Sequence, residues 1–419
     1  MSGVIITPRM LKGKVTPPPS KSAAHRAIIC ASMSNGVSKI EPFETSNDMR
    51  ATIGAVKALG AKVSLSENCL TVDGRDTFRT NCREIDCLES GSTLRFIIPV
   101  ASLADSEIIF TGKGRLPERP IGPYLDCLPK SGVICETKGG LPLKTKGKLK
   151  SGEFSLPGNI SSQFITGLLL ALPALTGDSI IKLTTPLESA GYVDLSISVM
   201  KQFGISVECR EQSYFVKGSQ KYTSCNFITE ADWSQAAFWL AAGALGADIT
   251  CDGIETGSKQ GDKAILDILK RLGAKVTGTR VCPGALSGCE IDASQIPDLV
   301  PPIAAVAALS RGTTVITGAK RLRIKESDRL SCVTRELNAL GARIKETEDG
   351  LVIDGVNELK GGEADGCNDH RIVMALSIAA MRSCGKVTIN GCECINKSYP
   401  KFFEHYNSLG GCADVVNDR

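Results

Sequence analysis

Hydrophobic positions along the chain recur in six similar blocks of about seventy residues. Every block contains an amphipathic helix pattern that ends at a glycine and is followed by a short strand pattern. The segments are VKALGAKVSL, CLPKSGVICE, MKQFGISVEC, LKRLGAKVTG, LNALGARIKE and YNSLGGCADV. Their glycines, spaced by 72, 72, 69, 68 and 69 positions, are Gly60, Gly132, Gly204, Gly273, Gly341 and Gly410. Because glycine is favoured where a helix ends in a left-handed residue, the pattern predicts a sixfold structural repeat.

A second series of segments is apolar on nearly every helical face, which is typical of helices that are buried on all sides. We expect these helices at 22–33, 92–103, 163–175, 235–245, 299–309 and 371–381. A short polar cluster precedes each of them: Ser20-Lys21-Ser22, Ser90-Gly91-Ser92, Ser161-Ser162-Gln163, Asp232-Trp233-Ser234, Pro297-Asp298 and Asn368-Asp369-His370. Serine, aspartate and asparagine cap helix N-termini, so the clusters indicate where the buried helices begin.

The six blocks divide naturally into two lobes of three. We predict an α/β (α+β) fold in which each lobe holds three buried parallel helices, surrounded by sheets and surface helices. The first lobe is expected to span 19–227, and the second to combine 1–18 with 228–419. The chain would cross between them near Ser224 to Thr229 and at Pro17-Pro18-Pro19, where consecutive prolines stiffen the backbone.

The composition is that of a globular protein, since 42% of the 419 residues are hydrophobic and 22% are charged. The apolar runs are too short for a signal peptide or a membrane span, so we expect a cytoplasmic protein that contacts no membrane. A formal net charge of +4 argues against a broad nucleic-acid surface. The 17 cysteines lack metal-ligand spacing, and no histidine lies near Cys392 and Cys394. We therefore expect reduced thiols and no metal site.

Parallel buried helices would present their N-termini on one face of each lobe, where unpaired N–H groups attract anions. The clusters and nearby loops also carry many cations: Lys21, Arg26, Arg95, Arg119, Arg323, Lys325, Arg329, Arg371 and Lys397. Any one of them taken alone could be an ordinary surface cation. Their recurrence at equivalent repeat positions favours a site for two anionic ligands instead.

Nine segments resemble motifs of the EPSP (5-enolpyruvylshikimate-3-phosphate) synthase family, in the same order and at similar spacing. PPPSKSAAHRAIICASM is similar to its N-terminal signature, GSTLRF to its glycine loop, LPERPIGPYLDCL to its Arg-Pro loop and GNISSQFITGLLLALP to its Ser-Ser-Gln segment. The later motifs correspond to ESAGYVDLSISVMKQFG, IPDLVPPIAAVAAL, RLRIKESDRL, CNDHRIVMALSIAA and INKSYPKFFEHYNSLG. The resemblance covers nearly the whole chain and implies the inside-out α/β barrel of enolpyruvyl transferases.

The resemblance also implies a reaction. The family transfers the enolpyruvyl group of phosphoenolpyruvate to the 5-hydroxyl of shikimate 3-phosphate and releases phosphate, on the shikimate pathway to chorismate and the aromatic amino acids. It needs no metal or organic cofactor. We expect these two small molecules as substrates, no nucleic-acid or membrane partner, and a monomer.

Two substrate-binding sets follow from the resemblance, position by position. Lys21 belongs to both sets. The residues that would bind shikimate 3-phosphate are Lys21, Ser22, Arg26, Ser161, Ser162, Gln163, Ser189, Tyr192, Asp298, Arg321 and Lys325. Those that would bind phosphoenolpyruvate are Lys21, Gly91, Arg119, Gln163, Arg329, Arg371 and Lys397. Guanidinium groups and helix N-termini suit the phosphate and carboxylate that each substrate carries.

Asp298 and Glu326 are the acid/base pair that the resemblance implies. Asp298 would lie next to the attacking hydroxyl with Lys397, and Glu326 beside the methylene carbon with Lys21 and His370. Plainer alternatives remain open for these residues. Asp298 could be a helix cap and His370 a core residue, while Glu326 and Asp328 could simply pair with Lys325 and Arg329 on a solvated turn.

The sequence departs from the family pattern at Glu89, where asparagine is frequent, at Phe96, where proline is frequent, and at Arg321, where asparagine is frequent. These departures bear on mimics of phosphoenolpyruvate such as glyphosate, to which the retained Gly91 predicts sensitivity. One rival hypothesis is the sister transferase that acts on UDP-N-acetylglucosamine, but its reactive cysteine is missing from 113–119. Another is a non-catalytic sensor of phosphorylated metabolites, which the two carboxylates disfavour.

Overall fold

The computed structural model describes residues 2–81 and 83–417, and the chain divides into two compact units. The N-terminal unit is Pro19–Glu230, and the C-terminal unit combines Met1–Pro18 with Ala231–Arg419. One crossing therefore lies between Pro18 and Pro19, within the proline run. The other follows Glu230, three residues beyond position 227.

The N-terminal unit contains α1 to α6 and β3 to β14. Its helices are α1 (Lys21–Ser32), α2 (Asn47–Ala58), α3 (Gly91–Ala101), α4 (Gly122–Cys127), α5 (Ser162–Ala171) and α6 (Ala190–Gln202), with 3-10 turns η1 (Leu116–Glu118), η2 (Pro129–Ser131) and η3 (Leu172–Ala174). Its strands are β3 (Val37–Glu41), β4 (Lys62–Leu65), β5 (Leu70–Asp73), β6 (Glu84–Asp86), β7 (Ile108–Thr111), β8 (Ile134–Glu136), β9 (Leu143–Lys146), β10 (Glu153–Leu156), β11 (Ser179–Leu183), β12 (Glu208–Arg210), β13 (Ser213–Val216) and β14 (Asn226–Ile228).

The C-terminal unit repeats this plan. Its helices are α7 (Trp233–Ala244), α8 (Ile265–Arg271), α9 (Val300–Ala307), α10 (Arg329–Ala339), α11 (His370–Ala379) and α12 (Phe402–Ser408), with 3-10 turns η4 (Gly261–Ala264), η5 (Pro297–Leu299), η6 (Lys320–Ile324), η7 (Ala380–Arg382) and η8 (Cys392–Lys397). Its strands are β1 (Ser2–Ile6), β2 (Lys12–Val15), β15 (Asp248–Cys251), β16 (Lys275–Thr277), β17 (Arg280–Cys282), β18 (Glu290–Asp292), β19 (Thr313–Thr317), β20 (Arg343–Glu346), β21 (Leu351–Asp354), β22 (Gly362–Asp365), β23 (Val387–Asn390) and β24 (Ala413–Asn417).

Over the described residues, the strands form six sheets of four strands each. Their orders are β14-β3-β5-β4, β6-β7-β9-β8 and β10-β11-β13-β12 in the N-terminal unit, and β16-β17-β15-β2, β18-β19-β21-β20 and β22-β23-β1-β24 in the C-terminal unit. Every sheet combines one parallel pair with antiparallel neighbours, as in β6 parallel to β7 and β7 antiparallel to β9. The strands nearest the crossings are edge strands of sheets in their own units: β2 pairs with β15, and β14 pairs with β3.

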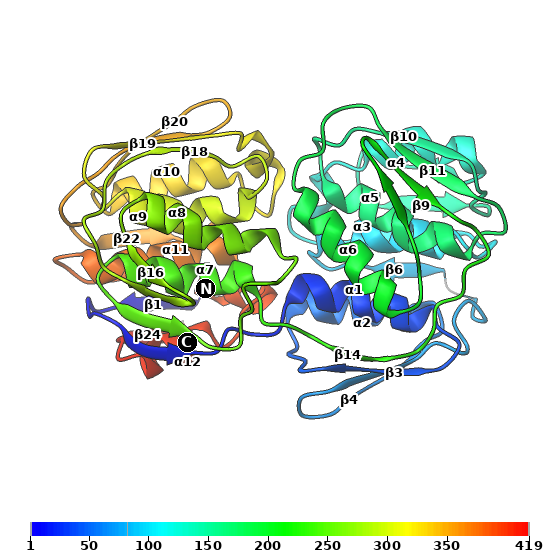
Figure 1. Ribbon diagram of the computed structural model, residues 1–419, viewed down its shortest axis with the longest axis horizontal. Helices are drawn as coiled ribbons and strands as arrows, with labels where there is room; N and C mark the ends of the chain where they lie inside the picture. Colours follow the sequence, from blue (N-terminus) through cyan, green and yellow to red (C-terminus); the bar gives the residue numbers. More distant parts are fainter. Residues whose placement is uncertain (1, 82, 418–419) are drawn as a thin grey trace. The chain divides into compact units, whose positions relative to one another are not determined.

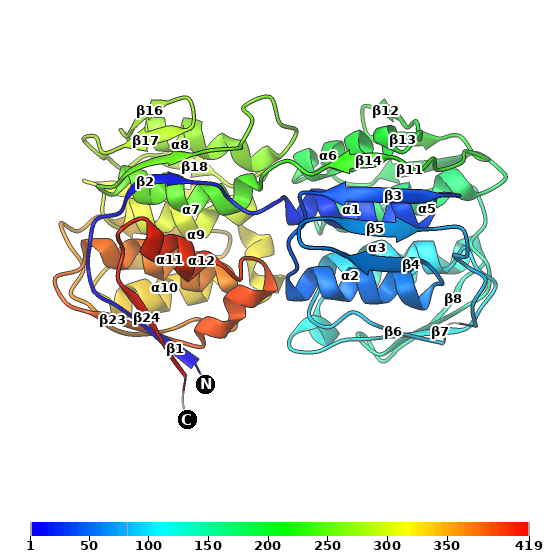
Figure 2. The same ribbon diagram turned by 90° about the horizontal axis from the view of Figure 1, so that it is seen from below.

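The buried helices of the sequence pattern are α1, α3, α5, α7, α9 and α11, and the sheets lie around them within each unit (Figures 1 and 2). The repeat architecture is thus confirmed, while some ends differ. The helix expected from 299 begins at Val300, after η5. Pro301 and Pro302 fit its first turn because those N–H groups have no helical partner.

The six repeat glycines end surface helices in the left-handed region, as predicted. Their φ angles are 111° at Gly60, 89° at Gly132, 82° at Gly204, 102° at Gly273, 102° at Gly341 and 90° at Gly410. The second block differs in its helix: α4 ends at Cys127 and the chain continues as η2 up to Gly132. Pro129 lacks the N–H that a longer α-helix would need there.

Each unit has its own apolar core. In the C-terminal unit Trp233, Phe238 and Trp239 of α7 are fully buried, and Trp239 stacks on Phe402 of α12 at 4.8 Å between ring centroids. In the N-terminal unit Tyr124 packs against Phe164, and its hydroxyl donates to the Arg95 carbonyl at 2.6 Å. Among the described residues, no helix is both long and apolar enough to cross a membrane.

Candidate active site

Capping side chains fix the starts of the buried helices. In the N-terminal unit the hydroxyls of Ser20, Ser90 and Ser161 accept from backbone N–H groups in the first turns of α1, α3 and α5, at 3.2–3.3 Å. In the C-terminal unit Asp232 and Asp369 do the same for α7 and α11. Asp298 lies in η5, just before α9, and its carboxylate accepts from Arg329 and Arg371.

We call the polar groups at the starts of α1, α3 and α5 the Lys21 half-site. Lys21 is the first residue of α1, and its Nζ lies 2.6 Å from the Asp48 carboxylate in the first turn of α2. The two side chains are only 17% and 12% exposed, so water screens this ion pair weakly. Asp48 was missed by sequence reasoning because nothing in the pattern of α2 indicates a partner 27 residues away.

Arg26 lies one turn inside α1 and is buried. Its Nε donates to Ser196 Oγ at 2.7 Å, its Nη1 to the Ser22 carbonyl at 2.7 Å and its Nη2 to the Tyr192 carbonyl at 2.9 Å. The guanidinium also lies over the Phe96 ring, 4.9 Å from its centroid. Burial lowers the pKa of Arg26 to about 10, which still leaves it charged at neutral pH. Arg26 thus joins the starts of α1 and α6.

The starts of α3 and α5 are joined through Gln163. Its amide donates to Ser92 Oγ at 2.9 Å and accepts from Arg95 Nη1 at 2.7 Å. Arg95 also donates to the Pro120 carbonyl and lies over the Phe164 ring. Sequence reasoning counted Arg95 among the cations of this face but gave it no substrate. The structure shows it as a residue that positions Gln163.

Gly91 and Arg119 lie against each other in the Lys21 half-site. A Cβ at Gly91 would come within 2.6–2.8 Å of the Arg119 guanidinium, so glycine allows this close approach. Arg119 is 6% exposed. Ser161 and Ser162 begin α5, and Ser189 precedes α6 with a left-handed φ of 57°.

We call the charged side chains around Asp298, in the C-terminal unit, the Asp298 half-site. Asp298 accepts from Arg329 Nη1 at 2.9 Å and Arg371 Nη2 at 3.3 Å, and Lys325 Nζ lies 3.5 Å away. Burial alone would raise the pKa of this carboxyl, but Arg371, Lys325 and Arg329 together hold it well below its usual value. Asp298 is therefore ionised at neutral pH in this arrangement.

Arg329 is the most buried cation of the half-site, with a side chain 2% exposed. Besides Asp298, it donates to Asp369 through Nε at 2.7 Å and to Glu326 through Nη2 at 2.8 Å. Burial opposes its charge, yet the carboxylates of Asp369, Glu326 and Asp298 raise its pKa. Asp328, in contrast, caps α10 and pairs with Arg323 at 3.0 Å. Of the two carboxylates of this turn, Glu326 thus belongs to the half-site and Asp328 to the helix cap.

The helix starts of the C-terminal unit converge on Arg371. Its guanidinium donates to Ser234 Oγ at 3.0 Å, at the start of α7, and to the Asp298 carbonyl at 3.2 Å, before α9. Arg371 itself stands in the first turn of α11. The N-termini of α7, α9 and α11 therefore meet within this unit, as the parallel arrangement predicts.

The remaining candidates surround this cluster. Lys397 of η8 donates to the Asn368 carbonyl at 2.7 Å, and His370 Nδ1 lies 3.8 Å from Asp369. Arg321 donates to the Ser294 carbonyl at 2.6 Å. Burial lowers the pKa of Lys325 to about 8, against the opposing effect of Asp298. The sequence pattern indicates Ser234 and Asp369 only as capping residues, although both also bind the cations of the half-site.

The fold of this chain is that of the enolpyruvyl transferases. The solved structure of the enolpyruvyl transferase NikO from Streptomyces tendae shares the fold, with a TM-score of 0.80 at 18% identity over 100% of this chain and 99% of that one. The EPSP synthase from Acinetobacter baumannii matches with a TM-score of 0.84 at 27% identity, over the full length of both chains.

The family model for EPSP synthase (3-phosphoshikimate 1-carboxyvinyltransferase) matches residues 5–406. A 3-phosphoshikimate 1-carboxyvinyltransferase from Clostridium kluyveri is 47% identical over 420 residues, which cover 99% of each chain. The chain belongs to the EPSP synthase family, and the resemblance expected from its motifs is confirmed.

Proposed function

We propose that this chain transfers the enolpyruvyl group of phosphoenolpyruvate to the 5-hydroxyl of shikimate 3-phosphate and releases phosphate. The observation that carries the proposal is the Asp298 half-site, where one half-buried carboxylate is held by three cations at the meeting point of α7, α9 and α11. Family membership over residues 5–406 supports the same reaction. The oxygen-rich, multiply charged substrates suit such a cluster.

Charge balance favours anionic substrates in both half-sites. In the Asp298 half-site the cations Lys325, Arg329, Arg371 and Lys397 outnumber the carboxylates Asp298, Glu326 and Asp369 by one. In the Lys21 half-site, Lys21 pairs with the carboxylate of Asp48, and Arg26, Arg95 and Arg119 add three further cations. A phosphate or carboxylate bound among these groups replaces water with preorganised donors.

We assign shikimate 3-phosphate to a set of side chains around α1, α5 and α6, together with groups from the C-terminal unit. Lys21 and Arg26 are its cations in the N-terminal unit. The hydroxyls and amide at the helix starts bind its phosphate and ring: Ser22, Ser161, Ser162, Gln163, Ser189 and Tyr192. Asp298, Arg321 and Lys325 complete this set. Among the residues that the structure describes, Arg26 donates three of its five N–H groups, and we propose that the other two serve the ligand.

We assign phosphoenolpyruvate to Arg119, Arg329, Arg371 and Lys397, with Lys21 and Gln163 in contact with both substrates. Gly91 leaves room for the phosphate beside Arg119. Guanidinium forks bind phosphate and carboxylate oxygens in pairs, which fixes the direction of the substrate as well as its position.

Asp298, with Lys397, is the proposed acid/base group for the 5-hydroxyl, and Glu326, with Lys21 and His370, is the proposed acid/base group for the methylene carbon. In the structure Asp298 is a weak base because Arg371, Lys325 and Arg329 hold its pKa low. Arg371 and Arg329 are also the proposed ligands of phosphoenolpyruvate. A bound anionic substrate would share these cations, so the pKa of Asp298 would rise toward the range in which it accepts a proton.

The 5-hydroxyl oxygen bonds to the central carbon of phosphoenolpyruvate, gives up its proton, and the methylene carbon takes a proton, which forms a tetrahedral adduct. The adduct then loses a proton from the new methyl group together with phosphate, which restores the double bond. No step of this reaction needs a metal or an organic cofactor. Each residue in this scheme binds a substrate, orients a substrate or transfers a proton. Exclusion of water around the two bound substrates would strengthen every ionic contact.

The location and the assembly state complete the proposal: a cytoplasmic enzyme that acts as a monomer. The described cysteines are all free thiols, the form that a reducing cytoplasm maintains. Light scattering of the purified protein would test the monomer, and fractionation of cells would test the location.

One assay separates the candidate functions. Purified protein should release phosphate from phosphoenolpyruvate only when shikimate 3-phosphate is present. Release with UDP-N-acetylglucosamine instead would point to the sister transferase, and binding of both ligands without turnover would point to a sensor. Lys21→Met should abolish turnover and leave thermal unfolding nearly unchanged; loss of the fold would mean that Lys21 is structural.

A further inference from the structure

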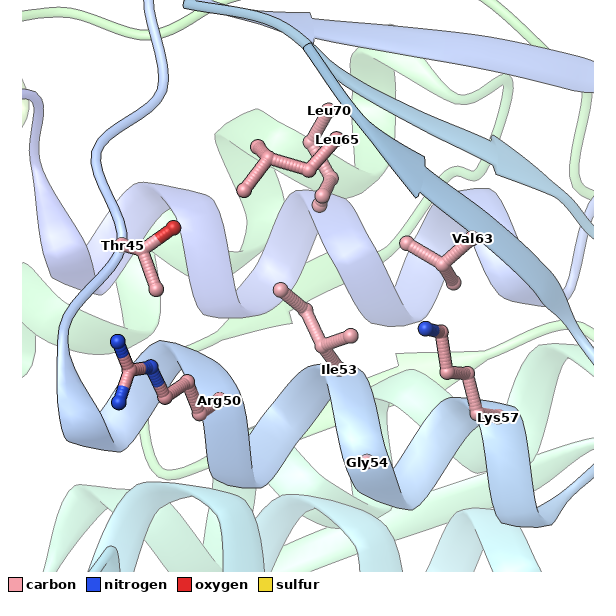
Figure 3. A pocket seen from close by; sticks show the side chains of 8 residues that line it. All are labelled: Thr45, Arg50, Ile53, Gly54, Lys57, Val63, Leu65 and Leu70. Atoms are coloured by element: carbon pink, nitrogen blue, oxygen red, sulfur yellow. The ribbon is translucent and has the colours of Figure 1, made fainter. Parts of the chain in front are cut away.

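A hollow of about 470 Å³ lies on the outer face of α2, within the N-terminal unit. Thr45, the helix residues Arg50, Ile53, Gly54 and Lys57, and the strand residues Val63, Leu65 and Leu70 line it (Figure 3). Its volume falls within the range of small-molecule sites. No candidate active-site residue named above lines it, and the proposed reaction makes no use of it. We call it the α2 hollow.

The walls of the α2 hollow are apolar. Val63 and Leu65 of β4 stand on the face of the sheet that carries Leu70 and Val72, because β4 and β5 pair in register. Leu70 and Val72 are fully buried, whereas Leu65 is 54% exposed. Ile53 lies opposite on the helix (Figure 3). An inner-face leucine that remains half exposed marks apolar surface that a ligand could cover.

Cations stand at the two ends of the hollow. Arg50 and Lys57 lie seven positions apart on the same face of α2, with Ile53 and Gly54 between them (Figure 3). At a rise of about 1.5 Å per residue, their backbone positions are about 10 Å apart along the helix. Neither side chain forms an ion pair or a side-chain hydrogen bond with the residues that the structure describes.

Gly54 forms the floor between the two cations. A Cβ added there would meet nothing within 4 Å, and its φ lies outside the left-handed region. Glycine inside a helix is less stable than alanine. Because Gly54 has no side chain, the floor of the hollow between the two cations is open.

We propose that the α2 hollow binds an elongated apolar molecule that carries a carboxylate at each end. The apolar body covers Ile53, Leu65 and Leu70, and the two carboxylates meet Arg50 and Lys57. A neutral molecule of the same shape would cover the apolar walls but would not pair with the two cations. A single inorganic anion would pair with one cation but would leave the apolar walls uncovered.

Helix α2 connects the hollow to the Lys21 half-site. Its first turn carries Asp48, the ion-pair partner of Lys21. Its inner face carries Thr52, whose hydroxyl contacts His25 Nδ1 of α1 and Thr93 Oγ1 of α3, both at 2.6 Å. Helix α2 therefore carries both the lining of the hollow and contacts to α1 and α3. Binding in the hollow does not depend on the proposed function.

The test is calorimetric titration with biphenyl-4,4′-dicarboxylate, and with biphenyl-4,4′-dimethanol as the neutral counterpart. Gly54→Leu, which fills the hollow, should weaken dicarboxylate binding at least tenfold. Gly54→Ala should change it less than threefold, and it should also raise Tm, which shows that the position tolerates a side chain. Arg50→Gln and Lys57→Gln should each weaken binding several-fold, while Lys201→Gln on the exposed face of α6 should not.

The proposal is overturned if the wild-type protein does not bind the dicarboxylate, if Gly54→Leu binds it as well as wild type does, or if the neutral counterpart binds equally well. Binding that survives Gly54→Leu but is lost in Arg119→Gln would assign the probe to the Lys21 half-site and would also overturn it. Turnover is measured separately. If the protein binds the probe but has no transferase activity, the proposed function is refuted and the proposal for the α2 hollow stands.

Discussion

Removal of the Arg329 guanidinium should destabilise the C-terminal unit by about 3–5 kcal/mol, the usual cost of leaving a buried carboxylate without its cation. In Arg329→Met the carboxylate left alone is Asp369, whose side chain is 0% exposed. Asp298 keeps Arg371 and Lys325, and Glu326 is 19% exposed and can be hydrated. The cost is therefore that of one buried charge and not of three.

The assay is urea unfolding followed by tryptophan fluorescence. Both tryptophans of the chain, Trp233 and Trp239, lie in α7 of the C-terminal unit, so their emission reports on the unit that contains Arg329. In a thermal scan of the same variant, the predicted loss corresponds to a fall in Tm of roughly 6–20 °C, at about 2–4 °C per kcal/mol. Lys320→Met in the same unit is the control, because both side chains of the Lys320–Glu348 pair are exposed, at 69% and 81%, and its loss should leave the unfolding midpoint nearly unchanged.

A double mutant separates the charge effect from lost packing. Asn at position 369 has no charge and can still cap α11, so Asp369→Asn should recover at least about 2 kcal/mol in the Arg329→Met background, as coupled neighbours do. If the single variant loses less than about 1 kcal/mol, or the double variant recovers nothing, the buried ion pairs do not hold this unit together and the reasoning fails.

Three further predictions concern turnover. Asp48→Asn removes the ion-pair partner of Lys21 and should lower kcat/KM about tenfold, with little change in unfolding; a change in stability alone would contradict the pairing role. Gly91→Ala should raise KM for phosphoenolpyruvate several-fold, because the methyl group displaces the Arg119 guanidinium, and an equal rise for shikimate 3-phosphate would argue against that assignment. The pKa of Lys325 is lowered to about 8, so its charge is present below pH 8 and lost above it; KM for shikimate 3-phosphate should rise as pH passes 8, and Lys325→Arg should remove that inflection.

The fold could be predicted from the sequence because its signals are local. Gly60 and Gly341 end their helices in the left-handed region, as a residue without a Cβ allows, and Ser20, Ser90 and Ser161 cap the helices that they precede. These effects act within one helical turn, so spacing and residue type suffice. The shortened α4 shows the limit, since Pro129 interrupts a pattern that looked like one helix.

The candidate site was predictable as a set of cations but not as a network. Asp48, Asp369 and Arg95 bind or position the cations and amide of the half-sites across 27 to 68 positions of sequence. No local pattern distinguishes a carboxylate that caps a helix from one that also binds a distant arginine, and Asp369 does both. The α2 hollow could not be predicted for a related reason. In the sequence, Gly54 only indicates a less stable point in a helix, and the open space beside it is visible only in the structure.

The internal carboxylates follow from the same physics as the anion sites. Parallel helix starts and clustered cations repel one another, so the fold needs negative charge among them in the absence of substrate. Asp48 supplies it at Lys21, and Asp298 and Asp369 supply it at Arg329 and Arg371. An incoming phosphate or carboxylate then competes with a carboxylate that already pairs with the cation. The net binding energy is therefore the difference between the new ion pair and the internal ion pair that it replaces. The same exchange frees Asp298 from its cations at the moment a substrate hydroxyl needs a base, which couples substrate binding to proton transfer in the proposed reaction.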